Sequence, residues 1–351
     1  MNDTLIPQVI PNLKDFDAKI FEGIVGQDNP KRAFDFYLNS YQATRVMPHI
    51  MLVAPKGQGK TRIARAVAKG LYQYDDEGQV IWKPSKTDAN KLVPKRKSFL
   101  EINCSTLKNV KQFINGVVVP LIQDKDVTVF FDEASEIPHD ISMALLTILE
   151  PNSTHRTQFS FDEYVCEFDF RRQSFIFATT ESQKVFCALA DRMERITLQE
   201  YSALDLANII KLNLKDVTIS DELLLEISSV LRGNARAAQK MSEKIKAYLK
   251  GALLFRKEDW NNLKGILSIT PLGLNPIEIQ ILRILQSRPE GTSLTALSAK
   301  TGMTAQQLRQ DSELYLLKHS LLDIENTGRH ISTLGQKYLD ELDGKSPSAT
   351  L

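Results

Sequence analysis

The first half of the chain alternates short apolar runs with stretches of helical periodicity. Residues 49–54, 127–132 and 174–179 are apolar runs of strand length, and residues 98–103 are a plausible fourth. Buried strands separated by helices are typical of parallel βαβ units. The pattern therefore predicts an α/β domain built on a parallel sheet with helices on both faces.

The strand signals stop after about residue 199, and helical patterns replace them. Ser202 begins a capping box for a helix at residues 204–212, and Ser220 is placed to cap a second helix. A third helix is expected at residues 235–250. These segments predict a small all-helical domain.

A different pattern begins at residue 275, where three amphipathic helices precede two short β-prone pieces. The third helix is expected at residues 304–320, and the β-prone pieces at residues 322–325 and 330–333 flank Asn326-Thr327-Gly328. Three helices followed by a hairpin are the order of a winged helix-turn-helix. The predicted domains are therefore an α/β domain at residues 1–199, a helical domain at residues 200–258 and a winged helix at residues 259–351.

The composition is that of an ordinary globular protein, with 42% hydrophobic and 25% charged residues. The formal net charge is only +1, so any DNA contact must come from a local basic surface. The three cysteines have no metal-ligand spacing, which suits a reducing compartment. No stretch approaches the roughly 20 apolar residues of a membrane span, and the N-terminus has no apolar signal core. We therefore expect a cytoplasmic protein with no membrane partner.

A glycine-rich loop follows the first strand and opens a helix, with the sequence Ala54-Pro55-Lys56-Gly57-Gln58-Gly59-Lys60-Thr61. Its glycines let backbone N–H groups turn inward around phosphates, and the helix N-terminus adds partial positive charge. Lys60 is expected to reach the β- and γ-phosphates of ATP, and the Thr61 hydroxyl to bind Mg²⁺. Ala54 stands where this motif usually has glycine, a change that is tolerated if its φ is negative.

Two acidic residues, Asp132 and Glu133, end the apolar run that begins at Val127. Asp132 is expected to hold the Mg²⁺ shell, and Glu133 to polarise the water that attacks the phosphate. The alternative is a strand that ends in a solvated acidic turn. Because both motifs occur in the right order and at the right distance, the sequence predicts an ATP hydrolase.

Further segments resemble the AAA+ ATPases. Thr180 ends a strand as the sensor 1 residue does, and Arg236 resembles sensor 2, which would reach over the γ-phosphate. Asn103 matches the asparagine that in relatives holds the catalytic glutamate inactive until DNA or substrate arrives. Arg192 resembles an arginine finger supplied to the ATP of a neighbouring subunit, with Arg195 as the alternative. Simpler roles, as strand-end polar groups or in a local salt bridge, remain open for these residues.

Within the AAA+ superfamily, residues 20–340 resemble the branch-migration ATPase RuvB. The stretch Gly23-Ile24-Val25-Gly26-Gln27 resembles the segment that wraps the adenine, and Thr180 matches the RuvB sensor, where most relatives carry Asn. An extra hairpin is expected at residues 155–171, where apolar positions alternate. In RuvB a hairpin here docks the junction-binding partner; the alternative is a padded domain edge.

The resemblance implies a ring, expected to be a hexamer, that couples ATP hydrolysis to movement on duplex or branched DNA. Arg329, at the tip of the expected wing, would meet a DNA phosphate; the alternative for the wing is a protein contact. Lys108 and Lys111 lie where the central-pore loops of relatives contact DNA. Residues 1–199 would be the ATPase domain, and residues 200–258 its helical lid.

Two departures mark a divergent relative. Residues 74–97 form a longer segment than the family needs, acidic at first and then basic, which is either a partner-facing or DNA-facing insertion or a solvated loop. Ala54 is the second. Two other functions share the ATP-site residues: an ATP-gated loader or recruitment switch that remodels a partner protein, and a DNA-binding regulator that has lost ATP turnover.

Overall fold

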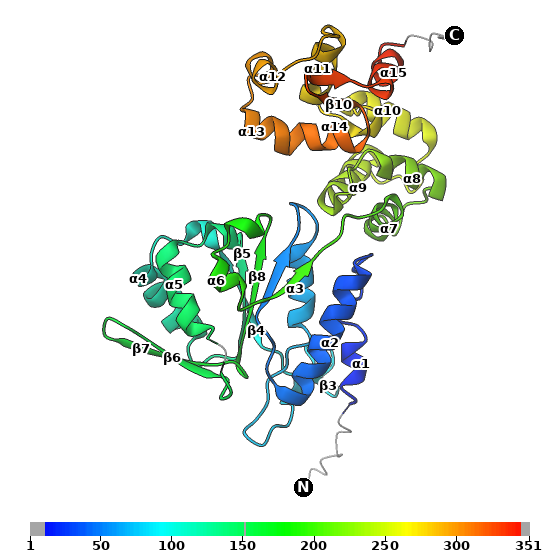
Figure 1. Cartoon of the computed structure of the whole chain (residues 1–351). Helices are drawn as coiled ribbons and strands as arrows, with labels where there is room; N and C mark the ends of the chain where they lie inside the picture. Colours follow the sequence, from blue (N-terminus) through cyan, green and yellow to red (C-terminus); the bar gives the residue numbers. More distant parts are fainter. Residues whose placement is uncertain (1–10, 151, 345–351) are drawn as a thin grey trace. The chain divides into compact units, whose positions relative to one another are not determined.

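The computed structural model describes residues 11–150 and 152–344 (Figure 1). The first of two compact units takes the residues up to Asn213 together with Gly233–Ser242, and the second takes Leu214–Arg232 and the residues from Glu243 onward. The predicted three-domain division stays a prediction, and the crossings between the units fall inside its helical part. Residues 1–10, where no signal core is expected, lie outside the described residues.

The first unit is built on a five-stranded parallel sheet. Its strands, in spatial order, are β4 (Ser98–Asn103), β5 (Val127–Asp132), β8 (Gln173–Thr179), β1 (Ile50–Val53) and β9 (Glu194–Thr197). The four strands that the apolar runs predict are confirmed. The edge strand β9 was not predicted, because it is short and carries charged residues, as edge strands often do.

Alternate residues of each strand pack into two separate hydrophobic cores. Ile50 and Leu52 of β1 face α2 (Asp28–Thr44) and α3 (Lys60–Ala68). Met51 and Val53 face the opposite core. That second core is covered by α4 (Val110–Phe113), the π-helical segment Ile114–Ile122 and α5 (His139–Ile148). The predicted parallel sheet with helices on both faces is thus confirmed, as Figure 1 shows.

Two hairpins extend from the first unit. The predicted hairpin is confirmed as the antiparallel pair β6 (Arg156–Phe161) and β7 (Tyr164–Asp169). The inserted segment 74–97 contains a second antiparallel pair, β2 (Trp82–Pro84) and β3 (Leu92–Pro94). The remaining helices of this unit are α1 (Lys14–Asp17), α6 (Cys187–Ala190) and α7 (Ala203–Asn213).

The second unit contains the predicted winged helix. Its helices are α8 (Asp221–Ser229), α10 (Lys257–Leu267), α11 (Pro276–Gln286), α12 (Leu294–Thr301), α13 (Ala305–Gln307), α14 (Leu314–Lys318) and α15 (Thr333–Leu342), with the wing strands β10 (Leu322–Glu325) and β11 (Gly328–Ile331). The helix α9 (Ala235–Leu249) begins in the first unit and ends in the second. The predicted cap is also confirmed, since the Ser220 hydroxyl accepts from the N–H of Leu223.

The structure also bears on the cysteines and on possible membrane-spanning helices. The three cysteines are free thiols. Among the described residues, no single helix is long and apolar enough to cross a membrane. One helical pair, Lys257–Gly273 with Pro276–Gln286, passes that test of length and composition together, with a 54° bend at its break.

The first unit buries a lysine that the sequence analysis did not single out. The side chain of Lys97 is buried; its Nζ donates to the Ser174 hydroxyl at 2.9 Å and lies 4.9 Å from the centroid of the Tyr41 ring. Burial lowers the pKa of Lys97 to about 7, although the carboxylates of Asp126 and Asp169 oppose that shift. The folded chain therefore releases the lysine proton at a pH where the unfolded chain still holds it.

We expect Lys97→Met to stabilise the protein most below pH 7. Between pH 7 and the ordinary lysine pKa, the unfolded state binds one proton more than the folded state, so the free energy of unfolding of the parent chain rises with pH. Relative to the variant, that rise is roughly 2–3 kcal/mol between pH 7 and pH 9. Urea unfolding of both proteins at pH 6, 7, 8 and 9 measures it, and a gap that stays constant with pH contradicts the burial argument.

Candidate active site

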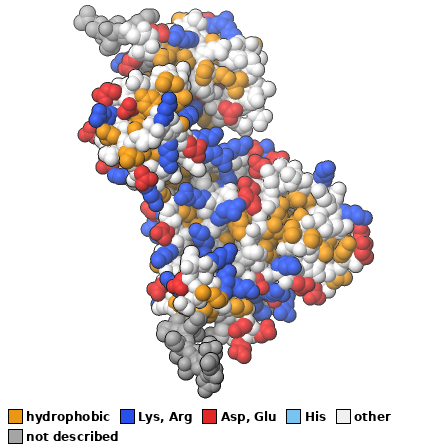
Figure 2. Space-filling model, turned by 180° about the vertical axis from the view of Figure 1, so that it is seen from behind, with side chains coloured by type: hydrophobic (Ala, Val, Ile, Leu, Met, Phe, Trp, Pro, Cys, Tyr) orange, Lys and Arg blue, Asp and Glu red, His pale blue; other side chains and the backbone are white. Residues whose placement is uncertain are grey.

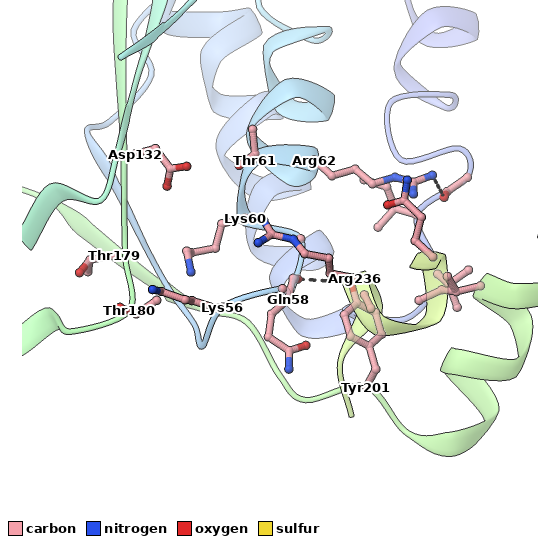
Figure 3. A pocket seen from close by; sticks show the side chains of 18 of the residues that line it. Lys56, Gln58, Lys60, Thr61, Arg62, Asp132, Thr179, Thr180, Tyr201 and Arg236 are labelled. Atoms are coloured by element: carbon pink, nitrogen blue, oxygen red, sulfur yellow. Dashed lines mark hydrogen bonds between the residues drawn. The ribbon is translucent and has the colours of Figure 1, made fainter. Parts of the chain in front are cut away.

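A pocket of about 350 Å³ lies in the first unit, where β1, β5 and β8 end. Of the predicted nucleotide-site residues, those that line it are Ile24, Val25, Lys56, Gly57, Gln58, Gly59, Lys60, Thr61, Asp132, Glu133, Thr180 and Arg236. In the view of Figure 3, Asp132, Thr179 and Thr180 lie on one side of the pocket and Arg62 and Tyr201 on the other, with Lys60 and Arg236 between them. The fold thus gathers segments more than 200 positions apart in the sequence.

The glycine-rich loop has the backbone that a phosphate cradle requires. Gly57 has φ +83° and Gly59 has φ +85°, a conformation that side-chain-bearing residues rarely adopt. A Cβ on Gly57 would lie 2.3 Å from Oδ1 of Asn234, so the loop has no room for one. Ala54 has no positive φ, and its N–H donates to the Thr179 carbonyl at 3.2 Å. Alanine therefore fits at the start of the loop without strain.

Lys60 turns its ammonium group back toward this loop. Its Nζ donates to the carbonyls of Ala54 at 2.7 Å and Pro55 at 3.2 Å, so Pro55 contributes through its backbone while lying outside the pocket lining. Burial lowers the pKa of Lys60, and the nearby carboxylate of Asp132 opposes this shift. A phosphate group next to the ammonium would likewise favour its charged form.

Glu133 sits in a strained turn directly after the buried strand β5. Its backbone is left-handed, with φ 58° and ψ 48°, and its N–H donates to Oδ1 of Asp132 at 3.0 Å. A residue other than glycine in this region costs on the order of 1–3 kcal/mol, and such residues gather at functional sites. The turn leaves the Glu133 side chain exposed and at the pocket wall, which is the placement that activation of a water molecule requires.

Three hydrogen bonds attach the start of α9 to the glycine-rich loop. Nε2 of Gln58 donates to the Gly233 carbonyl at 2.9 Å, and Nδ2 of Asn234 donates to the Lys56 carbonyl at 2.9 Å. The N–H of Arg236 donates to the Gly57 carbonyl at 3.1 Å. Arg236 is therefore held at the loop by its own backbone, while its side chain remains exposed and lines the pocket.

The segment expected to wrap the adenine is also tied to the pocket. Gln27 is buried, and its side-chain amide exchanges two hydrogen bonds with the backbone of Gln199, at 2.7 and 2.9 Å. Arg62 donates to the Gly23 carbonyl at 2.7 Å. Lys31 donates to the Ile24 carbonyl at 2.7 Å. These bonds fix Ile24 and Val25 at one wall.

Two further residues that shape this pocket were not predicted from the sequence. Tyr201 is buried; its hydroxyl donates to the Gln58 carbonyl at 3.5 Å, and its N–H donates to the Gly233 carbonyl at 3.4 Å. Asn234 is the second, and it also caps α9 by accepting from the N–H of Ala237 at 3.1 Å. The pair Gly233-Asn234 before a helix was the available signal for the cap. Nothing in the local sequence pointed to Tyr201.

Asn103 and Arg192 lie outside the pocket lining. Asn103 pairs with Asp132 in the sheet register, but its Oδ1 accepts from the N–H and hydroxyl of Ser105, at 3.0 and 2.8 Å. In the part of the chain that the structure describes, Asn103 makes no hydrogen bond to Glu133. Arg192 forms an ion pair with Glu150 and donates to the Ala188 carbonyl at 2.8 Å. Its alternative, Arg195, is exposed on β9.

The three candidate DNA-contacting residues differ in exposure and in ion pairing. The side chain of Lys108 is exposed, and Nζ of Lys111 lies 3.4 Å from Asp162 in the turn between β6 and β7. Arg329 was expected to project from the wing tip, and that expectation is wrong. It lies within β11 and donates to both carboxylate oxygens of Glu313, at 3.0 and 3.2 Å, with a side chain that is 14% exposed. The nearly buried Glu313 needs this cationic partner.

The molecular surface shows no field of a single charge on the face seen in Figure 2. Basic and acidic side chains are interspersed there, with exposed hydrophobic side chains among them. This agrees with the formal net charge of +1. DNA binding, where it occurs, must therefore rely on local groups of basic residues.

Comparisons with known protein families match two parts of the chain. Residues 50–201 match the family described as "ATPase family associated with various cellular activities (AAA)". Residues 271–340 match the family described as "RuvB C-terminal winged helix domain". The first match covers the sheet and the phosphate loop, and the second covers α11 through α15.

Curated relatives extend the likeness over nearly the whole chain. The Holliday junction branch migration complex subunit RuvB of Thermotoga maritima is 25% identical in an alignment of 341 positions that covers 92% of this chain and 91% of that protein. The RuvB subunit of Wolbachia sp. subsp. Drosophila simulans is 24% identical over 91% of this chain and 92% of its own length.

Solved structures show the same fold. The Thermotoga maritima RuvB Holliday junction branch migration motor has a TM-score of 0.67 to this chain at 22% sequence identity, with 90% of this chain and 95% of that chain covered. The pocket supplies the phosphate loop and the paired acids of an ATP hydrolase. The chain therefore contains an AAA ATPase domain and a C-terminal winged-helix domain of the RuvB type, and over most of its length it resembles the branch-migration motor RuvB.

Proposed function

We propose that this chain is a ring-forming ATPase that couples ATP hydrolysis to movement on duplex or branched DNA, as in branch migration. The observation that carries the proposal is the pocket that joins the phosphate loop, Asp132, Glu133 and Arg236 in one compact unit. The winged helix in the same chain supplies a module of a kind that binds DNA. Action on bacterial DNA would place the protein in the cytoplasm.

The residues present suit ATP with Mg²⁺. Gly57 and Gly59 have the positive φ values that let backbone N–H groups turn toward phosphate oxygens. The Thr61 hydroxyl and the Asp132 carboxylate are hard oxygen donors at the same pocket wall, which is the ligand type that Mg²⁺ prefers. When bound, Mg²⁺ would neutralise charge on the phosphates.

Each polar residue of the pocket has a distinct role in hydrolysis. Lys60 and Arg236 would bind the phosphate oxygens and stabilise the charge that develops on them. Glu133 would orient a water molecule and accept its proton. Thr180, at the exposed end of β8, would hold a phosphate oxygen or that water by its hydroxyl. Ile24 and Val25 would contact the adenine.

The arginine finger belongs, in this proposal, to a neighbouring subunit of a ring, most simply a hexamer. Arg192 lies outside the pocket of its own chain, so it can act only on another subunit's ATP. Asn103 is one strand away from Glu133 and would regulate it if its hydrogen bonds to Ser105 were exchanged for one to Glu133. The separation of these residues makes hydrolysis depend on assembly.

The proposal also assigns contacts with DNA and with a partner protein. Lys108 and Lys111 would contact DNA at the ring pore, and Arg329 would contribute to the wing only if it left Glu313. A junction-binding partner protein would dock on the β6–β7 hairpin. Val165 of that hairpin is exposed and would lie at such a contact.

We expect Glu133→Gln to lower ATP turnover by about 10²–10⁴-fold, because the amide cannot accept the proton of the attacking water. The ATP dissociation constant should change little, since Glu133 is not part of the phosphate cradle. Steady-state turnover, with and without duplex and four-way-junction DNA, measures the first effect. In the parent chain DNA should raise turnover.

The matched control is Glu136→Gln, an exposed glutamate three residues further on that does not line the pocket. It should hydrolyse ATP as the parent chain does. If the parent chain turns over ATP no faster than Glu133→Gln under every DNA condition, the proposed motor activity is lost.

A mixture of two inactive variants tests the assignment of Arg192. Arg192→Ala keeps an intact pocket but offers no finger, while Glu133→Gln offers the finger but has a dead pocket. Alone, each should hydrolyse ATP at least about 10²-fold more slowly than the parent chain. In rings formed from equal amounts, about a quarter of the sites should combine an intact pocket with an intact finger, so turnover should return.

Arg195→Ala is the control, because it removes the neighbouring exposed arginine. It should keep parental turnover if Arg192 is the finger. Absence of any recovery in the mixed rings, with assembly verified by light scattering, would show that Arg192 acts only within its own subunit.

A further inference from the structure

The chain crosses between its two compact units three times, after Asn213, after Arg232 and after Ser242. The crossing after Arg232 differs from the others because the next residues form part of the pocket. Gly233 accepts a hydrogen bond from Gln58 of the phosphate loop, and Arg236 lines the pocket. Arg232 is therefore joined by one peptide bond to a residue that is hydrogen-bonded to the phosphate loop.

On its other side, Arg232 is anchored to the winged-helix unit. Its Nη1 and Nη2 donate to the two carboxylate oxygens of Glu278 at 3.2 and 2.8 Å. The guanidinium carbon lies 3.5 Å from the centroid of the Tyr315 ring, which is stacking contact. Glu278 is completely buried, so its charge depends on this arginine.

Glu278 also belongs to the first turn of α11. Its carboxylate accepts from the N–H of Asn275 at 2.8 Å, while Oδ1 of Asn275 accepts from the N–H of Glu278 at 2.9 Å. This capping box fixes the carboxylate relative to the helix. A displacement of Arg232 would therefore reach the start of α11 through the buried carboxylate of Glu278.

The residues just before Arg232 are packed closely within the second unit. Arg232 has φ 57° and Gly233 has φ 66°, so two successive residues are left-handed. A Cβ on Gly273 would lie 2.2 Å from the Val230 carbonyl, which shows how closely the segment before Arg232 packs against the residues that precede α11. The hydroxyl of Tyr315 donates to the Leu272 carbonyl at 2.7 Å and holds the stacking ring in place.

We propose that Arg232, paired with Glu278 and stacked on Tyr315, is the positioning residue that couples nucleotide binding in the pocket to the winged helix. A shift of the phosphate loop on ATP binding would move Gly233 through its hydrogen bond with Gln58. Arg232 is bonded directly to Gly233 and would move with it, and its ion pair with Glu278 would pass the movement to α11. The inference rests on the proposed function, since it assumes that the pocket binds ATP. The coupling is reciprocal, so DNA bound at the winged helix would alter the pocket by the same route.

Hydrogen–deuterium exchange of the full chain tests this coupling without requiring DNA. The Glu133→Gln protein is used so that ATP with Mg²⁺ stays bound during labelling. ATP should slow exchange in the phosphate loop, residues 56–61, and also in the first turns of α11, residues 276–282. Protection of α11 amides is the readout, because a residue with only a structural role would not make it depend on ATP.

The first test variant is Arg232→Met combined with Glu278→Gln. The glutamine can still accept from the N–H of Asn275, and no buried charge is left unpaired, so the fold is retained. ATP should protect residues 56–61 as before, whereas the ATP-dependent slowing at residues 276–282 should fall by at least about threefold. Arg232→Lys, which keeps the charge but loses the bidentate pair and the stacking, should show an intermediate loss.

Arg283→Gln is the matched control. Arg283 lies on the same helix and forms an ion pair with Asp343, but it has no connection to residue 233. It should leave the ATP-dependent protection of α11 unchanged. Melting temperatures of all variants are measured alongside, so that a general loss of stability is recognised by faster exchange with and without ATP.

The outcomes separate this inference from the proposed function. If ATP protects the phosphate loop but not α11 in the parent protein, or protects α11 equally in the double variant, the coupling role of Arg232 is overturned while the ATPase proposal stands. If ATP protects neither segment, both are overturned. Loss of the α11 response in the double variant alone supports the coupling.

Discussion

The structure depends on the attachment of residues 233–236 to the phosphate loop. Three hydrogen bonds close the pocket over the phosphate loop. They run from Gln58 to Gly233, from Asn234 to Lys56 and from Arg236 to Gly57. The acceptor in each of the three bonds is a backbone carbonyl, so the bonds depend on the path of the backbone more than on the side chain of the accepting residue. They turn two segments that are over 170 positions apart into one pocket and bring a guanidinium to the phosphates.

The sheet order makes that attachment useful. Because β8 lies between β1 and β5, the phosphate loop, Thr180 after β8 and the acids at the end of β5 lie at the same edge of the sheet. The rings of Phe131 and Phe177 stack at 4.7 Å and 6° within the core beneath this edge. Such packing fixes the ends of β5 and β8 relative to each other, and this rigidity permits the strained turn at Glu133.

Features encoded locally could be predicted from the sequence. The apolar runs gave four strands, the alternation at residues 155–171 gave the hairpin, and the spacing of glycines and acids gave most of the pocket. What could not be predicted depends on partners far along the chain. Tyr201 reaches the pocket through tertiary packing alone, and nothing near Arg329 in the sequence shows that Glu313 holds it. The edge strand β9 was missed because its charged residues resemble a loop.

Three arginine–glutamate pairs show why exposure, rather than the presence of a partner, decides what an arginine can do. Glu150, the partner of Arg192, is 56% exposed, and separating such a pair costs about 0–1 kcal/mol because water solvates both ions. In the proposed ring, Arg192 could therefore leave Glu150 to act on a neighbouring subunit. Glu278, the partner of Arg232, is fully buried, and losing its arginine would cost about 3–5 kcal/mol. The pair of Arg232 and Glu278 is therefore expected to stay together in the folded protein. The pair of Arg329 and Glu313 is nearly buried, so its separation should also be costly. The same ion pair is thus easily separated where it is exposed and costly to separate where it is buried.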